Sequence, residues 1–395
     1  MHFSQPEPLI RGPTHSTVKF VRLRQRISFR LNQYRRVRET SATHLARENA
    51  STWQQVYPEQ RTTWPQVFPS GPVPAGFSGR LGEKSRPKGV LRLRGASVWS
   101  DDGWIFTANG GRVSDTTAYA EDPEWMPRVH LPLFRSGERR VAGRTLSLLS
   151  NWATGNFFHM LLDVLPRIDL LFRAGWTWAD FDHILIPAFR SSTIDRLLAT
   201  LNLPQAKIIA VTWGQMIYFR CDELVCASYP GGRRAVLPTT VNYLRQLNPP
   251  QTTKSGRRLF VRRLARTRSL RNESELLPFL AGHGFEVIDP GAIPDAETAF
   301  YESDYIVGPH GAALANLVFC RPGTKVLELV PTDHAYPYFF TLSAGAGLHY
   351  DCLLGRSDHE TVRPLVSRWT SKSDFTVDPV DFSRALNRLM ERATG

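Results

Sequence analysis

The chain has 395 residues, of which 42% are hydrophobic and 22% are charged, so it can bury a sizeable core and is too long for one ordinary domain. A count of 49 Lys and Arg against 36 Asp and Glu gives a formal net charge of +13. This charge indicates polyanions, phosphate-bearing ligands or an acidic membrane surface as partners, without choosing among them.

The four cysteines are too few for a disulfide framework, and we expect reduced thiols, as in a cytosolic protein. The first residues lack the apolar core of a signal peptide. No stretch reaches the roughly 18 uninterrupted apolar residues that a spanning helix needs. We therefore expect a cytoplasmic protein, either soluble or peripheral at the inner face of a membrane.

Residues 1–89 are expected to form a basic, Pro- and Gly-rich extension, with the folded body beginning near Val90. The first 50 residues hold ten basic side chains against three acidic ones. Within residues 20–34 apolar residues recur at helical spacing between arginines, although the local alternation also permits a strand. For residues 17–38 two interpretations stay open: contact with an anionic membrane, or an arm that is solvated or packed on a partner.

Residues 90–248 are predicted to form a first α/β domain. A hairpin is expected at 97–107, and strands at 144–150, 183–187, 206–212 and 216–228. The intervening helices are expected at 155–173, 192–201 and 239–247. The Pro-rich, polar run at 249–256 is the predicted interdomain linker.

Residues 257–376 alternate more regularly. Strands are expected at 258–262, 285–289, 305–308 and 325–330, with helices at 273–282, 295–302 and 312–319 between them. This alternation predicts a parallel sheet covered on both faces, which binds ligands at the carboxyl ends of its strands. A last helix within 377–395 is expected to pack back on the first domain.

A tight Gly-rich turn follows the strand that contains Ile306. In it His310, Gly311 and Ala312 open a helix that also contains Asn316, and the free N–H groups of such a helix start attract phosphate. The alternative is a plain strand-to-helix turn with a hydrogen-bonded histidine.

Charged residues mark two other strands of this domain. Glu328 interrupts a central strand, so it should either pair internally or meet ligand hydroxyls, as a ribose-binding carboxylate does. Arg262 and Arg263 follow the strand that contains Phe260 and suit bidentate recognition of a diphosphate, whereas runs of arginine are commonly a solvated face.

The first domain carries a polar stripe on a hydrophobic helix. Asn156, His159, Asp163 and Arg167 are spaced by three, four and four residues, so they line one face, which we expect to border a cleft. There His159 would take a proton from an acceptor hydroxyl while Asp163 orients its ring, and Asp163 itself is the other candidate base. The alternative is local capping and pairing.

Several enzyme signatures are absent, including a phosphate-binding Gly-x4-Gly-Lys-Ser/Thr loop, His-Glu-x-x-His and Gly-x-Ser-x-Gly. Asp180-Phe181-Asp182 formally matches an acidic metal-binding pair, but it precedes a strand instead of following one. The sequence thus predicts no metal site and no cofactor.

Three segments together resemble the family 61 glycosyltransferases, whose bacterial members are often described as capsular polysaccharide biosynthesis proteins. They are residues 156–167, residues 261–263 with the downstream Arg271-Asn272-Glu273, and residues 308–316 with Glu328. Two departures stand out: Val261 lies where the family usually has Ser, and Ala313 replaces a glycine of Gly-Ala-Gly-Leu-Thr-Asn.

The resemblance implies a GT-B-like architecture, in which two Rossmann-like domains face a central cleft and the C-terminal one holds a nucleotide sugar. It implies inversion at the anomeric carbon without a required metal, with a glycan or lipid-linked saccharide as acceptor in surface polysaccharide synthesis. Donor-binding residues would be Arg262, Arg263, His310, Gly311, Ala312, Asn316 and Glu328, and His159, Asp163, Asn156 and Arg167 would serve the acceptor side. Two alternatives remain: a basic nucleic-acid-binding protein, against which the absence of interleaved aromatics argues, and an inactive nucleotide-binding scaffold.

Overall fold

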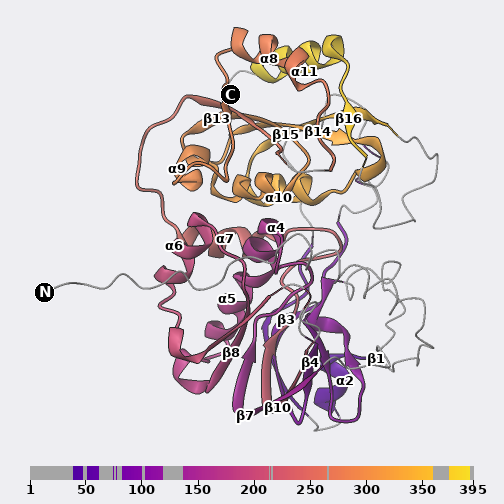
Figure 1. Ribbon diagram of the computed structural model, residues 1–395, viewed down its shortest axis with the longest axis vertical. Helices are drawn as coiled ribbons and strands as arrows, with labels where there is room; N and C mark the ends of the chain where they lie inside the picture. Colours follow the sequence, from indigo (N-terminus) through magenta and orange to yellow (C-terminus); the bar gives the residue numbers. More distant parts are fainter. Residues whose placement is uncertain are drawn as a thin grey trace, which may run out of the picture.

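The computed structural model describes residues 39–47, 51–61, 74, 77, 82–99, 103–118, 137–212, 214, 217–264, 267–358 and 373–391. These residues form two lobes, each built on one sheet with helices against it (Figure 1). The α/β class predicted from the sequence is therefore confirmed. Residues 17–38 lie outside the described residues, so both interpretations of the basic segment stay predictions. No helix in the described ranges is long and apolar enough to cross a bilayer.

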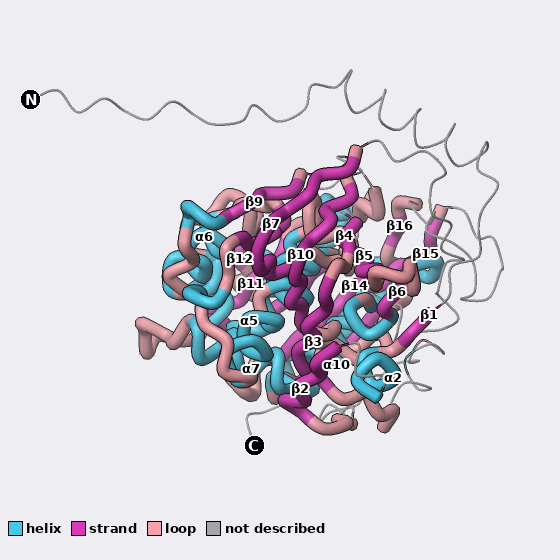
Figure 2. The backbone as a smooth tube through the Cα atoms, turned by 90° about the horizontal axis from the view of Figure 1, so that it is seen from below, coloured by secondary structure: helices cyan, strands magenta, loops and turns pink. Residues whose placement is uncertain are grey.

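The sheet of the N-terminal lobe mixes parallel and antiparallel strands. Its order is β1-β6-β5-β4-β10-β7-β8-β9, and β3 joins β10 beside β4 and carries β2. Figure 2 shows most of these strands side by side across the lobe. Their bounds are β1 Glu39–Thr40, β2 Ser51–Tyr57, β3 Lys88–Arg94, β4 Ser97–Trp99, β5 Trp104–Phe106, β6 Arg112–Val113, β7 Glu138–Ser147, β8 His183–Pro187, β9 Ile208–Val211 and β10 Tyr218–Ala227.

Strands β10, β7, β8 and β9 run parallel. The chain passes outward from β7 to β8 and β9 and then returns to place β10 on the other side of β7. The direction of winding thus reverses between β7 and β10. Such a topological switch point opens a crevice at the carboxyl ends of the two strands, where ligands of open α/β sheets bind.

The helices of this lobe begin at residues suited to helix starts. Asn156 and Ser191 accept hydrogen bonds from the backbone N–H groups of Phe158 and Ile194 as N-caps. Proline occupies the first position of the helices that begin at Pro166 and Pro238, where its missing N–H costs nothing. The helices are α2 Ala42–Arg47, α4 Phe157–His159, a π turn Met160–Val164, α5 Pro166–Arg173, α6 Ser192–Thr200 and α7 Pro238–Leu247.

The C-terminal lobe contains the predicted parallel sheet. Its order is β12-β11-β13-β14-β15-β16, and every pair is parallel except β15 with the short β16. The winding reverses between β11 and β13, which gives this lobe a switch point of its own. The strands are β11 Arg257–Val261, β12 Glu286–Ile288, β13 Ser303–Pro309, β14 Lys325–Pro331, β15 His349–Ser357 and β16 Phe375–Thr376.

Helices cover both faces of this second sheet. On the side away from the N-terminal lobe lie α8 (Glu273–Gly282) and α11 (Pro379–Glu391). Toward that lobe lie α9 (Ala296–Tyr301), the 3₁₀ helix η7 (Ala312–Phe319) and α10 (Tyr338–Ala346) (Figure 1). The sequence predicted a helix at 312–319 but not its 3₁₀ geometry, and it missed α10 and β15.

One hydrophobic cluster runs through both lobes. It includes residues from the first sheet, from α4, α5 and α7, and from η7, α10 and the facing side of the second sheet. Hydrogen bonds cross the same boundary: Arg245 Nε donates to Val318 O at 2.9 Å and its Nη2 to Ala346 O at 3.0 Å, and the Val236 N–H donates to Thr341 Oγ1 at 3.1 Å. An apolar interface of this kind holds the lobes in a defined relation.

Two predictions about the ends of the chain are wrong. Helix α11 does not pack on the first sheet: Phe382, Leu386 and Leu389 are buried against α8, β14 and β15, because the apolar outer face of the second sheet needs cover. The folded body also begins well before Val90, since β1, α2 and β2 belong to the first lobe. There Leu45 is buried on the far side of the first sheet, and β2 pairs with β3.

Candidate active site

The first half of the site lies at the carboxyl end of β7. The chain leaves Ser147, turns through residues 148–155 and enters α4, which carries His159. His159 Nδ1 lies 2.6 Å from Asp163 Oδ2, and the two side chains are 15% and 5% exposed. Because the carboxylate accepts the Nδ1 proton, the neutral ring presents the lone pair of Nε2. This is the arrangement of a general base with an orienting carboxylate.

A π turn separates His159 from the rest of the helix. Leu165 N–H donates to Met160 O at 3.3 Å, five residues back, and Pro166 directly after it has no N–H to continue the ladder. The proline thus interrupts the hydrogen-bond ladder of the helix at this point. The turn widens the helix while keeping His159 and Asp163 in contact.

Arg167 does not line a cleft, contrary to the sequence-based prediction. Its side chain is buried, and it donates to the carbonyls of Asp163 at 2.9 Å, Thr116 at 2.8 Å and Ala227 at 3.2 Å. Burial lowers its pKa, an effect that the negative charge of Asp163 counteracts. Arg167 therefore ties the helix to the end of β10, and the stripe predicted from spacing divides into a histidine pair and a structural arginine.

Asn156 serves as the N-cap of α4, so its side-chain oxygen is occupied by the Phe158 N–H at 2.9 Å. The alternative of local capping thus applies to Asn156. It does not apply to His159, whose Nε2 has no hydrogen-bond partner among the described residues.

The second half of the site lies at the switch point of the C-terminal lobe. Arg263 follows β11, and His310 and Gly311 follow β13. A Cβ atom on Gly311 would overlap the Arg263 Nη1 atom, so any side chain at this position would displace the guanidinium from the turn. Arg262 instead turns outward and pairs with Glu273 at 2.6 Å, so the two arginines are not equivalent.

The start of η7 offers unpaired backbone donors. The His310 N–H donates to Leu329 O at 2.9 Å. The N–H groups of Ala312 and Ala313, in contrast, have no hydrogen-bond acceptor among the described residues. Such donors beside an arginine form a favourable place for an anion. Asn316, one turn on, donates to Ala313 O at 3.0 Å and is buried, so it shapes the helix instead of reaching the turn.

Glu328 is fully buried, and each of its carboxylate oxygens has a partner within the protein, as the alternative of internal pairing expects; its contact with a ribose stays a prediction. Its Oε1 lies 2.5 Å from His310 Nδ1, and Tyr350 Oη donates to its Oε2 at 2.5 Å. Burial raises the pKa of Glu328 to about 8, against a lowering by the Tyr350 hydrogen bond. Glu328 therefore fixes the orientation of His310.

Positive charge surrounds His310 and the neighbouring His334. Burial lowers the pKa of both histidines, and the guanidinium groups of Arg263 and Arg268 lower it further. The pKa of Arg263 itself falls to about 10 through burial and the proximity of Arg268. No ion pair neutralises Arg263 or Arg268 within the described residues, so the turn is a partly buried cationic centre that favours an anion.

Aromatic rings join the two halves. The His159 ring centroid lies 5.2 Å from that of Phe158, Phe158 lies 5.8 Å from Phe339, and Phe339 lies 5.1 Å from His310. Helices α4 and η7, which follow the two switch points, also pack on each other. The histidine pair of one lobe and the cationic turn of the other thus lie on the same side of the molecule.

Sequence reasoning missed Tyr350, His334 and Phe339 as members of this site. The aromatic run His334, Tyr336, Tyr338 and Phe339 directly follows β14, so its position at a strand end was a usable signal. Tyr350 carried no such signal, because it lies inside a strand that the sequence did not predict.

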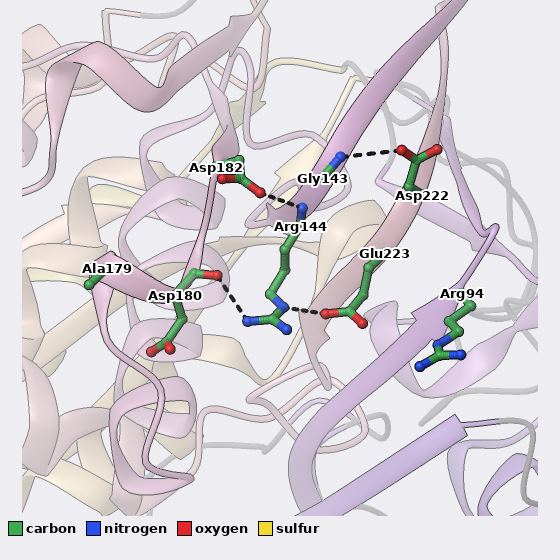
Figure 3. Close-up of a pocket in the computed structure, with 8 residues that line it drawn as sticks. All are labelled: Arg94, Gly143, Arg144, Ala179, Asp180, Asp182, Asp222 and Glu223. Atoms are coloured by element: carbon green, nitrogen blue, oxygen red, sulfur yellow. Dashed lines mark hydrogen bonds and ion pairs between the residues drawn. The ribbon is translucent and has the colours of Figure 1, made fainter.

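A separate open hollow of about 620 Å³ lies beside the middle of β7 and β10 and just before the start of β8 (Figure 3). The Arg144 side chain crosses this hollow. Its Nε donates to the Glu223 carboxylate, and its Nη1 donates to Asp180 O at 3.3 Å. The Asp180 carboxylate accepts a hydrogen bond from the Thr177 N–H, and the Asp182 carboxylate accepts one from the Arg144 N–H. No cluster of three or more metal-ligating side chains occurs among the described residues.

Parallel strands whose switch points carry functional side chains define an α/β protein that can hold a ligand at its strand ends. Residues 157–327 match the family model described as Glycosyltransferase 61, so this part of the chain is similar to the domain of that family. They contain His159, Arg263 and His310.

The chain is also 36% identical over 55 residues to a curated relative, the beta-1,2-xylosyltransferase RCN11 of Oryza sativa subsp. japonica. The matched segment covers 14% of this chain and spans about a tenth of the length of that relative.

Proposed function

We propose that the protein transfers a sugar from a nucleoside-diphosphate sugar to a hydroxyl of a glycan or lipid-linked saccharide, with inversion at the anomeric carbon. The observation that carries this proposal is the pairing of a base-type histidine, His159 with Asp163, and a cationic turn, Arg263 with His310, on one side of a domain similar to that of family 61. The architecture we propose is GT-B-like, and the two lobes with their own switch points support it.

In the proposed reaction, His159 Nε2 takes the proton of the acceptor hydroxyl while Asp163 stabilises the imidazolium that forms. The acceptor oxygen attacks the anomeric carbon from the face opposite the leaving group. The bond from that carbon to the diphosphate oxygen breaks, and the electron pair leaves with the nucleoside diphosphate.

Arg263, Arg268 and the free N–H groups of Ala312 and Ala313 would stabilise the charge on the departing diphosphate. Supplied in this way, the positive charge does the work that a divalent ion does in other transferases, so we propose a metal-independent reaction. The support is the partly buried, unneutralised guanidinium pair beside His310.

The biological setting we propose is surface polysaccharide synthesis at the inner face of a membrane, where a lipid-linked acceptor lies. The net charge of +13 and the basic first 50 residues support contact with anionic lipid. Because the rice relative is a xylosyltransferase by its name, nucleoside-diphosphate xylose belongs among the donors to test.

The test is a thermal-shift screen of nucleoside diphosphates and their sugars, with and without EDTA, followed by product analysis with saccharide acceptors. We expect one nucleotide sugar to stabilise the protein whether or not EDTA is present, and transfer to follow with inverted configuration. A strict requirement for a metal would contradict the leaving-group step. Nucleotide binding without transfer to any acceptor would indicate an inactive scaffold.

A further inference from the structure

The loop between β7 and α4 places a tryptophan in a strained conformation beside the histidine pair. Trp152 has φ of 59°, in the left-handed region that bulky residues avoid. The loop is held by hydrogen bonds from Ala153 N–H to Ser150 O at 3.3 Å and from Gly155 N–H to Trp152 O at 3.2 Å. Such strain persists only where the surrounding structure enforces it, and it gathers at functional sites.

The strain directs the indole onto the proposed base. The ring centroids of Trp152 and His159 lie 5.0 Å apart, with their planes inclined at 44°. Burial of an apolar ring does not account for this position, because Trp152 stays partly exposed while its neighbours Asn151 and Ala153 are buried. A partly exposed indole next to a base offers its uncovered apolar surface to whatever the base acts on.

Polar side chains on both sides of Trp152 lack partners. Asn151 is 1% exposed, and neither its amide oxygen nor its amide nitrogen has a hydrogen-bond partner among the residues that the structure describes. The buried Thr154 hydroxyl has none among them either. A buried amide without partners is costly, so a ligand or water normally satisfies it. A hydroxyl-rich molecule above Trp152 would supply both a donor and an acceptor.

We propose that Trp152 and Asn151 form the acceptor-sugar subsite, in which the pyranose ring packs on the indole and one of its hydroxyls is set at His159 Nε2. The C–H face of a sugar ring suits an aromatic platform, while its hydroxyls satisfy the amide of Asn151. This inference rests on the proposed function and names the residues that select the acceptor.

The experiment compares five variants of the full chain, three at Trp152, one at Asn151 and one control. Trp152→Phe keeps an aromatic face, Trp152→Leu keeps apolar bulk without one, and Trp152→Gly removes the ring and relaxes the left-handed backbone. Asn202→Gly is the matched control, because Asn202 also has a positive φ, of 49°, but is exposed at the end of α6, away from the site. The readouts are the acceptor KM at saturating donor, donor hydrolysis without acceptor, and saturation-transfer NMR with methyl glucoside, galactoside, mannoside and xyloside.

We expect Trp152→Leu and Trp152→Gly each to raise the acceptor KM at least about tenfold and to remove the glycoside signal in the NMR measurement, while donor hydrolysis stays at the wild-type rate. Trp152→Phe should stay within about threefold of wild type, and Asn202→Gly should not differ from it. Asn151→Ala, which loses no protein hydrogen bond, should raise the acceptor KM while the protein stays folded.

An unchanged acceptor KM in Trp152→Leu, with normal transfer by the wild type, would overturn the subsite and leave the proposed function intact. If the wild type neither transfers nor hydrolyses any nucleoside-diphosphate sugar, the proposed function itself fails and the subsite falls with it. Should Trp152→Gly fail to fold, Trp152→Leu against Trp152→Phe decides the question, since both keep apolar volume and differ in the aromatic face.

Discussion

The two lobes each carry a histidine–carboxylate pair at a strand end, and the pairs differ in their surroundings. His159 and Asp163 are one helical turn apart and 15% and 5% exposed. His310 and Glu328 come from neighbouring strands, are 6% and 0% exposed, and have Tyr350 and two arginines around them. The same two functional groups therefore sit in a proton-accepting setting in one lobe and in an anion-binding setting in the other.

The contrast shows that residue type alone does not assign a role. A partly exposed histidine with a carboxylate at Nδ1 is suited to take up a proton at Nε2. A histidine whose pKa is lowered by burial and by nearby arginines is better suited to holding a ligand in place. We expect variants of the two pairs to fail in different ways.

The largest effect is expected at the exposed pair. His159→Ala should reduce turnover by about 10²- to 10⁴-fold, because the acceptor hydroxyl loses its base. His283→Ala is the control, since the His283 ring lies at the end of the outer helix α8, where its Nδ1 contacts the Phe279 carbonyl. Steady-state kinetics measures both, and full turnover by His159→Ala would refute the assignment of the base.

A structural role for Arg167 predicts a loss of stability instead of a loss of acceptor affinity. Arg167→Met leaves several buried carbonyls without donors and should cost about 3 kcal/mol of unfolding free energy. Arg173→Met, on the same helix, removes only a half-exposed pair with Asp169 and should cost less than about 1 kcal/mol. Urea denaturation compares them, and equal costs would argue against the structural role.

The cationic turn can be perturbed through its glycine. Gly311→Ala forces the Arg263 guanidinium to move, and we expect a donor KM raised by about tenfold or more with the acceptor KM unchanged. Gly282→Ala at the end of α8 is the matched control, because its Cβ would meet nothing within 4 Å. A donor KM equal to that of the wild type in Gly311→Ala would show that Arg263 does not contribute to donor binding.

The smallest effect concerns the pH dependence of stability at the buried pair. The pKa of Glu328 is raised to about 8 in the folded protein, against an ordinary value near 4.5 in the unfolded chain. The protonated carboxyl therefore contributes to the free energy of unfolding in full below about pH 4.5, and this contribution is lost as the pH rises through 8. The lowered pKa of His310 changes stability only below about pH 6.5. Between about pH 6.5 and 8.5 the change in stability is therefore assigned to Glu328. The melting temperature of the wild type should fall across that range more steeply than that of Glu328→Gln, and parallel profiles would contradict the protonated carboxyl.

Local patterns predicted much of this fold. Strand β8 and helix α8 have the bounds that the sequence predicted, because short apolar segments of this kind are local features. The contact between His159 and Asp163 also followed from spacing alone.

Long-range partners could not be predicted. Arg167 looked like a member of a polar stripe, but its acceptors Thr116 and Ala227 are 51 and 60 residues away and come together only through the sheet. Glu328 looked like a ligand-binding carboxylate because its partners are distant in the sequence. The residues next to Glu328 do not show that His310 and Tyr350 on β15 lie against it. The strain at Trp152 is likewise a backbone property that its sequence does not reveal.

The most direct test of the division of work between the lobes is calorimetric titration with the nucleoside diphosphate that most stabilises the wild type. His159→Ala should bind it with wild-type affinity, whereas Arg263→Ala should bind it at least about tenfold more weakly. Unimpaired binding by Arg263→Ala, or lost binding by a folded His159→Ala, would contradict the account.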